Sequence, residues 1–246
     1  MKLIFILLLI SLVTGCSHIT PANYHSLYIP ADGFKVVQHT NSNQARKDNA
    51  LYLPSRKIKN DEFKTNGLTN FIKELRMTMH SKRGVGIAAN QVGKNLQIFL
   101  IEVNMDALWY EQLDVFPFQV FINPKITKAS SERINFWHGC LSATGEKPGN
   151  VATYEWIEYE ALNADGELHR GRLSGFAAVI FQHELRHLLG GTYLDKAGHF
   201  IDLKEFYSRL ENNELLLFEQ ADKDAPMLLD DYVINETLDE YYTRNQ

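Results

Sequence analysis

Hydrophobic and polar positions along this chain follow two different periods. Apolar runs and two-residue alternation, bounded by turn residues, predict β-strands at 97–103, 118–122, 151–162 and 167–173. Asn123 and Pro124 should end the second of these strands. Residues 163–166, with the sequence Asn-Ala-Asp-Gly, should form the turn of a hairpin.

Two other stretches repeat apolar residues every three or four positions, as amphipathic helices do. In the first, the spacing of Phe71, Leu75 and Met79 predicts a helix that ends before Gly84. The second lies between Ser174, a suitable N-cap, and the pair of glycines at 190–191. Strands followed by a central helix indicate a fold of the α+β class.

An apolar segment follows Lys2 at the N-terminus. Residues 3–12 are apolar except for Ser11, and about ten such residues are too few to cross a bilayer, which takes roughly 20. We therefore predict a signal sequence over residues 1–15. The small residues before Cys16 resemble a bacterial lipoprotein cleavage site, so Cys16 should carry lipid and anchor an exported protein to a membrane of the cell envelope. The alternative is an ordinary secretory signal with a chance cysteine.

The rest of the chain divides by composition into three parts. Residues 16–48 hold Cys16 and a polar stretch that we expect to be a linker. Residues 49–210 should form one domain, and residues 211–246 an acidic extension with a local charge of −8, in part helical around 228–242. The whole chain has a net charge of −5, and nothing in it suggests binding to nucleic acid.

The second predicted helix contains the motif His-Glu-Leu-Arg-His at 183–187. His183 and His187 stand four residues apart, so they project from one helix face and can bind the same metal ion. Glu184 then lies beside the metal and can take a proton from water, whose pKa the metal lowers. The plainer interpretation is a core helix with two buried histidines.

A catalytic metal site usually has three protein ligands and one open position. Position 193, where one metallopeptidase pattern has its third histidine, is Tyr193 here. Glu205 or Glu211 could serve instead, which keeps a zinc peptidase as an alternative. Cys140 is the stronger candidate, because a thiolate and two imidazoles form a tetrahedral site with one open corner. With Cys16 lipidated and Cys140 on a metal, no pair of thiols is left for a disulfide.

A glycine-bearing segment at 84–91, Gly-Val-Gly-Ile-Ala-Ala-Asn-Gln, precedes the first predicted strand. Its small residues let the backbone approach another group closely, and the amide of Gln91 can donate to an oxygen atom. Alone, this segment is a weak signal, because glycine turns between helices and strands are common and the phosphate-binding pattern is absent.

Together, the segments at 84–91, 138–142 and 183–187 resemble the three motifs of the peptide deformylase family, in the same order. The resemblance covers about 49–204 and implies antiparallel strands wrapped around the helix that carries the histidines. It also implies one divalent metal ion, Fe²⁺ first and Zn²⁺ or Ni²⁺ as alternatives, bound by Cys140, His183 and His187. The implied reaction removes the N-formyl group from peptides that begin with formyl-Met.

The resemblance also assigns roles around the metal. Glu184 would act as general base and acid, and Gln91 with the backbone N–H of Leu141 would form the oxyanion hole. Close backbone approach at Val85 and Gly86 suits a small formyl group. Val179, one turn before His183, can line a pocket for the first side chain of the substrate.

Three positions depart from the family pattern. His138 stands where the family has an acidic residue, Arg186 where it has an aspartate, and Thr153 where an arginine is usual. Arg186 should place a positive charge near the metal. These changes leave two functions open, an active hydrolase and a catalytically impaired metal-binding lipoprotein of the envelope.

Overall fold

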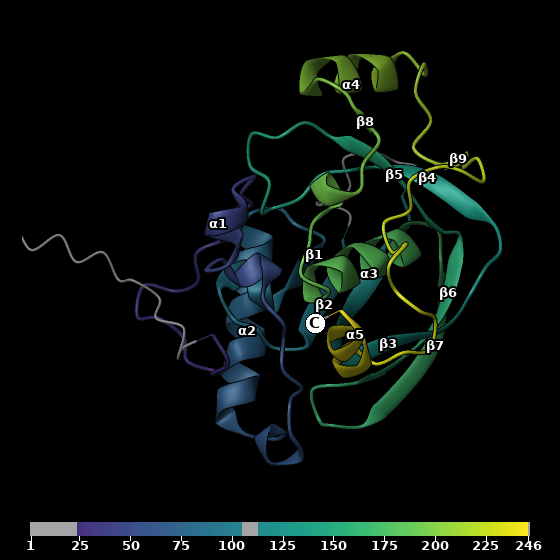
Figure 1. Cartoon of the computed structure of the whole chain (residues 1–246). Coiled ribbons are helices and arrows are strands. Elements are labelled where there is room, and N and C mark those ends of the chain that lie inside the picture. The colour runs from purple at the N-terminus through teal and green to yellow at the C-terminus, as the bar shows by residue number, and fades with distance from the viewer. Residues whose placement is uncertain (1–23, 105–112, 246) are drawn as a thin grey trace, which may run out of the picture.

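Two antiparallel sheets and a central helix form the body of the molecule (Figure 1). The computed structural model describes residues 24–104 and 113–245. The larger sheet has five strands in the order β1-β2-β3-β6-β7, with every neighbouring pair antiparallel. Its strands are β1 (Gly86–Ala88), β2 (Ile98–Val103), β3 (Phe116–Ala129), β6 (Trp156–Leu162) and β7 (Leu168–Ser174).

The smaller sheet has four strands in the order β8-β5-β4-β9. Its central pair is β4 (Arg133–His138) and β5 (Gly149–Tyr154), and its edges are the two-residue strands β8 (His199–Phe200) and β9 (Glu219–Gln220). The chain enters this sheet directly from β3 and leaves it directly into β6, so the two sheets are continuous along the sequence.

The central helix α3 (Gly175–Leu188) lies between these strands in Figure 1. All of its residues from Ala178 to Leu188 are buried, because the helix is covered on every side. Phe181 packs its ring against Phe99 and Phe121 of the larger sheet, with ring centroids about 5 Å apart in edge-to-face geometry. The helix that carries the histidine motif is therefore fixed at the centre of the core.

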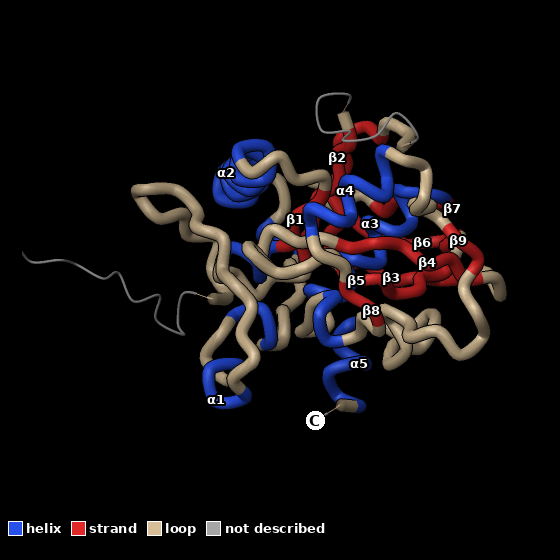
Figure 2. The backbone as a smooth tube through the Cα atoms, turned by 90° about the horizontal axis from the view of Figure 1, so that it is seen from above, coloured by secondary structure: helices blue, strands red, loops and turns tan. Residues whose placement is uncertain are grey.

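The helix α2 (Asn66–Ser81) covers another part of the larger sheet. Thr65 caps it through its side chain, and Phe71, Leu75 and Met79 are fully buried, as their spacing predicted. Shorter helices complete the fold, and Figure 2 shows α1 and α2 on the side away from β9. They are α1 (Asn43–Arg46), α4 (Leu203–Glu211) and α5 (Leu238–Arg244), with 3₁₀ turns at Ala50–Tyr52, Asn60–Glu62, Ala89–Val92 and Tyr193–Asp195.

Two of the predicted strands differ from the observed strands by more than one residue. β3 continues through Asn123 and Pro124, because Asn123 adopts a positive φ of 51° and the register shifts there, so the strand bulges and does not stop. The stretch 151–162 is divided at Glu155 between β5 and β6, which belong to different sheets. The hairpin of β6 and β7 around 163–166 is confirmed.

The described part of the expected linker is not a free tether. Phe34 packs edge-to-face on Phe71 of α2, and the backbone N–H of Val37 donates to the carbonyl of Gln91 at 2.7 Å. Gln38 also donates through its side chain to the carbonyl of Leu141 at 3.2 Å. Residues 24–48 thus lie against the domain and brace two segments of the predicted site. Their polar composition concealed this because the contacts are mainly hydrogen bonds from polar side chains and backbone groups, which have no apolar periodicity.

The acidic C-terminal segment also packs into the domain. Leu228, Leu229 and Leu238 are buried, and Tyr242 donates from its hydroxyl to the carbonyl of Leu188 at 2.6 Å. The helix of this segment is α5, shorter than the 228–242 expected. None of the helices in the described ranges is long and apolar enough to cross a membrane. The predicted signal sequence and Cys16 lie outside the described residues.

Candidate metal centre

Three side chains from distant parts of the chain converge beside α3. Cys140 follows the end of β4, whereas His183 and His187 lie one turn apart on α3. A ligand atom from each of the three lies within 4.8 Å of the others. Cys140 Sγ is 3.2 Å from His187 Nε2. The sequence-predicted ligands therefore meet at a single point, with the histidines buried and the cysteine partly exposed.

The histidine rings are held in orientations that suit a metal ion. His187 Nδ1 lies 3.0 Å from the carbonyl oxygen of Gly191, so Nδ1 carries the proton and the lone pair of Nε2 faces Cys140. Burial lowers the pKa of His187, and lowers the pKa of His183 to about 4, so both imidazoles are neutral. Burial raises the pKa of the Cys140 thiol to about 12, and a bound cation would oppose this shift by stabilising the thiolate.

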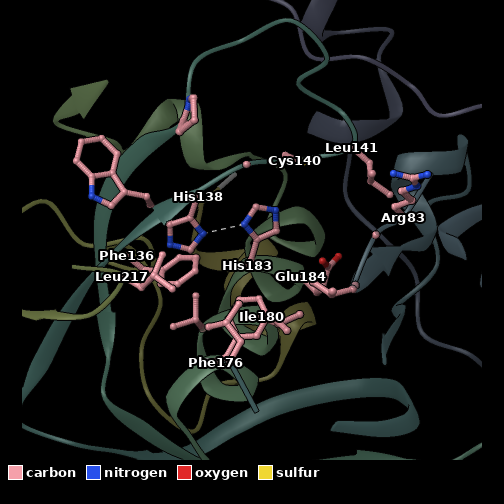
Figure 3. Close-up of a pocket in the computed structure, with 18 of the residues that line it drawn as sticks. Arg83, Phe136, His138, Cys140, Leu141, Phe176, Ile180, His183, Glu184 and Leu217 are labelled. Carbon is pink, nitrogen blue, oxygen red and sulfur yellow. Dashed lines mark hydrogen bonds between the residues drawn. The ribbon is translucent and has the colours of Figure 1, made fainter. Parts of the chain in front are cut away.

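His138 is the buried partner of His183. The two Nδ1 atoms are 3.0 Å apart, and the rings stack with centroids 5.3 Å apart at an angle of 13° (Figure 3). If His183 offers Nε2 to a metal, its Nδ1 carries the proton and donates to His138. The residue that departs from the family pattern therefore orients a metal ligand, as a carboxylate commonly does. The sequence alone gave no sign of this contact.

Thr153 and His138, two of the departures from the family pattern, lie at different positions along the smaller sheet. The register of β4 and β5 pairs His138 with Gly149 and Thr153 with Ile134. Thr153 is fully buried, and its hydroxyl has no hydrogen-bond partner within the described ranges. The two departures are therefore separate features of the smaller sheet.

Glu184 and Gly86 are in close contact. A Cβ atom added at Gly86 would overlap the carboxylate of Glu184 and the side chain of Ile180, so β1 can pass α3 only with glycine at this position. Glu184 is 3% exposed, and its Oε2 has no partner among the described groups. Burial raises the pKa of this carboxyl well above its usual value. These properties fit a group that exchanges protons with a bound substrate.

The side-chain amide of Gln91 is aimed at the same point. Its Oε1 accepts from the backbone N–H of Ala88 at 2.8 Å, which leaves the NH₂ group facing Ser142 Oγ at 3.2 Å and Cys140 Sγ at 3.5 Å. The backbone N–H of Leu141 makes no hydrogen bond with any described group. Two donors, one of them free, thus lie beside the predicted metal ligands.

A cavity of about 370 Å³ opens from this cluster. Val85, Gly86 and Val179, predicted to contact substrate, all line it. So do residues that the sequence analysis did not single out, because they come from α4, the C-terminal segment and the chain before β3. Those additional lining residues are Leu113, Leu203, Phe206, Tyr207 and Leu217. Their wall is apolar, and Phe136 and Phe176 add aromatic rings to it.

Arg186 turns away from the predicted metal ligands toward the C-terminal segment. Its Nη1 lies 2.9 Å from both carboxylate oxygens of Asp231. Lys196 and the hydroxyl of Tyr241 also approach Asp231. The charge that we expected near the metal is therefore largely balanced by an acidic partner.

The alternative third ligands are not part of the cluster. Glu205 and Glu211 lie on α4 and are exposed, and Glu205 faces Arg209 on its own helix. Tyr193 is buried, with its ring 6.2 Å from that of His183 and its hydroxyl bonded to the carbonyl of Lys147. Within the described ranges, Cys140 with the two histidines is the one group of this kind.

An antiparallel α+β fold around a helix with Cys-His-His ligands and an adjacent buried glutamate defines a metal-dependent hydrolase. The polypeptide deformylase family model matches residues 44–201 of the chain. The chain belongs to this family, and the resemblance of the three motifs is confirmed.

Individual relatives agree with this assignment. Peptide deformylase 1 of Nitrosomonas europaea is 34% identical over 146 residues, which cover 59% of this chain and 81% of the relative. Peptide deformylase of Aquifex aeolicus is 38% identical over 128 residues, covering 52% of this chain and 71% of the relative. A class I type b peptide deformylase from Acinetobacter baumannii, in a structure with Met-Ala-Ser bound, superposes with a TM-score of 0.59 at 28% identity, covering 66% of this chain and 97% of that one.

Proposed function

We propose that this chain hydrolyses the N-formyl group of peptides that begin with formyl-Met, with Fe²⁺ as its native metal and an envelope membrane as its location. The observation that carries the proposal is the convergence of Cys140, His183 and His187 beside the buried Glu184 in a deformylase fold. The departures from the family pattern leave this convergence intact.

The donor set fits a divalent metal ion. A soft thiolate and two neutral imidazoles suit Fe²⁺, Zn²⁺ and Ni²⁺, and each histidine has its second nitrogen fixed by a buried partner. When bound, such an ion would lower the pKa of water and polarise a carbonyl oxygen. Among these three ions we propose Fe²⁺, because the resemblance to the family implies it.

The polar groups around the ligands have complementary tasks. The amide of Gln91 and the N–H of Leu141 would donate to the formyl oxygen as negative charge develops on it. Glu184 would accept a proton from the water molecule that attacks the formyl carbon and would then deliver it to the leaving amine nitrogen. Its burial and unpartnered oxygen support this task, because the carboxyl is not committed to a structural ion pair.

The shape of the pocket supports a formylated apolar residue as substrate. Gly86 lets the backbone of β1 lie directly against the carboxylate of Glu184, and both residues line the cavity. Val179, Phe136 and Phe176 form an apolar pocket that would accept an unbranched side chain such as methionine. The pocket therefore supports recognition of the first residue through burial of apolar surface.

The proposed location depends on the N-terminal sequence. The apolar run before Cys16 supports export, and the lipoprotein-type residues around Cys16 support attachment of lipid. An exported enzyme would meet released formyl-peptides rather than chains on the ribosome. We propose that such peptides are its substrates.

An anaerobic assay tests the function directly. The full chain, loaded in turn with Fe²⁺, Ni²⁺ and Zn²⁺, would be incubated with formyl-Met-Ala-Ser and acetyl-Met-Ala-Ser, and the free amine measured. We expect turnover of the formyl-peptide, fastest with Fe²⁺, and far slower release from the acetyl-peptide. A fully loaded protein that cleaves neither would favour the metal-binding lipoprotein.

A further inference from the structure

Two positive side chains stand at the mouth of the pocket. Lys82 and Arg83 line it at the C-terminal end of α2, and both are exposed. Neither side chain has a hydrogen bond or ion pair with any residue in the described ranges. The carboxyl group of Glu184 lies at the inner end of the lining, beside the metal ligands (Figure 3). The mouth of this pocket therefore favours an anion, although the chain as a whole is acidic.

The backbone of Arg83 adopts a conformation that favours glycine. Its φ is 55°, and it ends α2 by donating to the carbonyl of His80 at 2.9 Å. The helix terminus accounts for a cation at Lys82, because positive charge is favourable there. It does not account for an exposed arginine in the left-handed region. Disfavoured backbone conformations of this kind cluster at ligand sites.

β1 offers an open edge that leads from Glu184 to Arg83. It is an edge strand of the larger sheet and pairs there with β2, and the N–H of Glu102 in β2 donates to the carbonyl of Val85, just before β1, at 2.9 Å. Because backbone groups alternate in an antiparallel pair, those of Gly84 and Gly86 face away from β2. The N–H of Gly84 already donates to the carbonyl of Met79 at 3.0 Å, so the carbonyl of Gly84 and both backbone groups of Gly86 face this edge. An extended peptide can therefore add to this edge as a further strand.

The length of that edge sets the length of the peptide. Arg83 precedes Gly86 by three positions, which span about 10 Å in an extended chain. A substrate with its formyl group at Glu184 begins opposite Gly86 and runs antiparallel to β1. Its second and third residues then lie beside Gly84 and Arg83. The carboxylate of a tripeptide ends within reach of the guanidinium.

We propose that Arg83, assisted by Lys82, binds the terminal carboxylate of a short N-formyl peptide. The inference rests on the proposed deformylase function and narrows its substrates to released peptides of about three residues. Charge-assisted hydrogen bonds from a guanidinium fork match the geometry of a carboxylate. An acidic side chain at the third residue would present the same chemistry, so the test includes it.

Three peptides separate these cases: formyl-Met-Ala-Ser as free acid, the same peptide as C-terminal amide, and formyl-Met-Ala-Asp amide. With the metal-loaded full chain we expect kcat/KM for the acid to exceed that for the amide by about three- to tenfold, a modest ratio because the pair stays near solvent. The preference should appear in KM and shrink at high salt. Arg83→Gln should bring the ratio close to one, and Arg83→Lys should restore part of it.

Lys64 provides the matched control. It is also a basic residue with a positive φ, 58°, and it does not line the pocket. Lys64→Gln should therefore keep the wild-type preference for the free acid. Loss of the preference in this variant would mean that general surface charge, rather than Arg83, determines it, and the proposal would be wrong.

Other outcomes also overturn the proposal. Equal kcat/KM for acid and amide in the wild type, or a ratio that survives Arg83→Gln, would remove the role of Arg83. A faster reaction of the aspartyl amide than of the free acid would assign the site to an acidic side chain instead. The role of Arg83 can also be tested without turnover, by measuring how tightly the Glu184→Gln variant binds the free acid and the amide. A preference seen there, with no deformylation by the wild type, would retain the carboxylate site and reject the proposed reaction.

Discussion

Arg186 and Asp231 join the metal-binding helix to the C-terminal segment. Nη1 of Arg186 lies 2.9 Å from both carboxylate oxygens, and Arg186 is 7% exposed. A side chain added at Gly191 would overlap this guanidinium, so the glycine after α3 makes room for the pair. The ion pair holds the acidic segment against the end of α3 that carries His187.

Asp231→Asn should destabilise the fold, because Arg186 would keep a buried charge without its counter-ion. Loss of one partner of a fully buried pair costs about 3–5 kcal/mol, and Asp231 is partly exposed, so we expect about 1–3 kcal/mol. Urea denaturation followed by circular dichroism measures this loss. Glu158→Gln, which breaks the exposed Lys128–Glu158 pair, is the control and should cost less than about 1 kcal/mol. Equal effects of the two variants would contradict this account.

The same pair predicts a dependence of stability on pH. Burial alone would raise the pKa of Asp231, but the charge and hydrogen bonds of Arg186 outweigh it and lower the pKa below 3.8. The contribution of Asp231 to the stability of the fold is therefore complete above the pKa that Asp231 has in the unfolded chain. It is lost as the pH falls through the lower pKa of the folded state. The difference in unfolding free energy between wild type and Asp231→Asn should narrow in acid below about pH 4. A difference that stays constant down to that range would argue against the ion pair.

His138→Phe should weaken metal binding, because His183 would lose the acceptor that fixes its ring. Loss of such a supporting hydrogen bond typically costs 10- to 100-fold in metal affinity, and we expect about that loss here. Competition with a chelator gives the affinity. His138→Glu supplies a stronger acceptor and should hold the metal at least as tightly as the wild type. If the His138→Phe and His138→Glu variants bind the metal equally well, the contact between His138 and His183 does not position the ligand.

Cys140→Ala should abolish tight binding of one metal ion per chain, since two imidazoles would remain as ligands. Metal analysis after gel filtration measures the stoichiometry. Cys140→Ser keeps the approximate size of the side chain and tests whether the thiolate itself is required. One tightly held ion in the alanine variant would point to a different third ligand.

Glu184→Gln should separate metal binding from turnover. Glutamine keeps the size of the side chain but cannot accept a proton near neutral pH, so metal content should stay near one per chain while kcat falls by about 10²- to 10⁴-fold. Gln91→Leu keeps the base and removes one donor, and should lower kcat by about 10²- to 10³-fold. Full activity in Glu184→Gln would exclude it as general base.

Cys16→Ala should release the protein from the membrane fraction, because a cleaved leader without lipid leaves no stable anchor. Fractionation and immunoblotting show the distribution, and the mass of the N-terminal peptide shows whether the leader has been removed. A processed chain that begins at another residue would disprove the lipoprotein proposal.

The linker and the acidic extension show where composition misleads. Residues 24–48 and 211–245 are polar or acidic, and both stretches pack on the domain through hydrogen bonds, ion pairs and buried apolar residues. Val37 illustrates this, because its contact with Gln91 uses the N–H that every residue except proline has. Composition cannot reveal such a contact.

The sequence by itself predicted the three residues of the metal-ligand cluster, the glutamate beside them and the central helix. The spacing of His183 and His187 places them on one face of any α-helix. Apolar periodicity is also a local property, so it can be recognised without knowing the fold. The tertiary structure decided the neighbours of those residues. His138 meets His183, Arg186 meets Asp231, and Phe206 and Leu217 reach the pocket, across separations of about 20 to 45 residues. Such contacts depend on how strands and loops are placed in three dimensions, which no local pattern encodes.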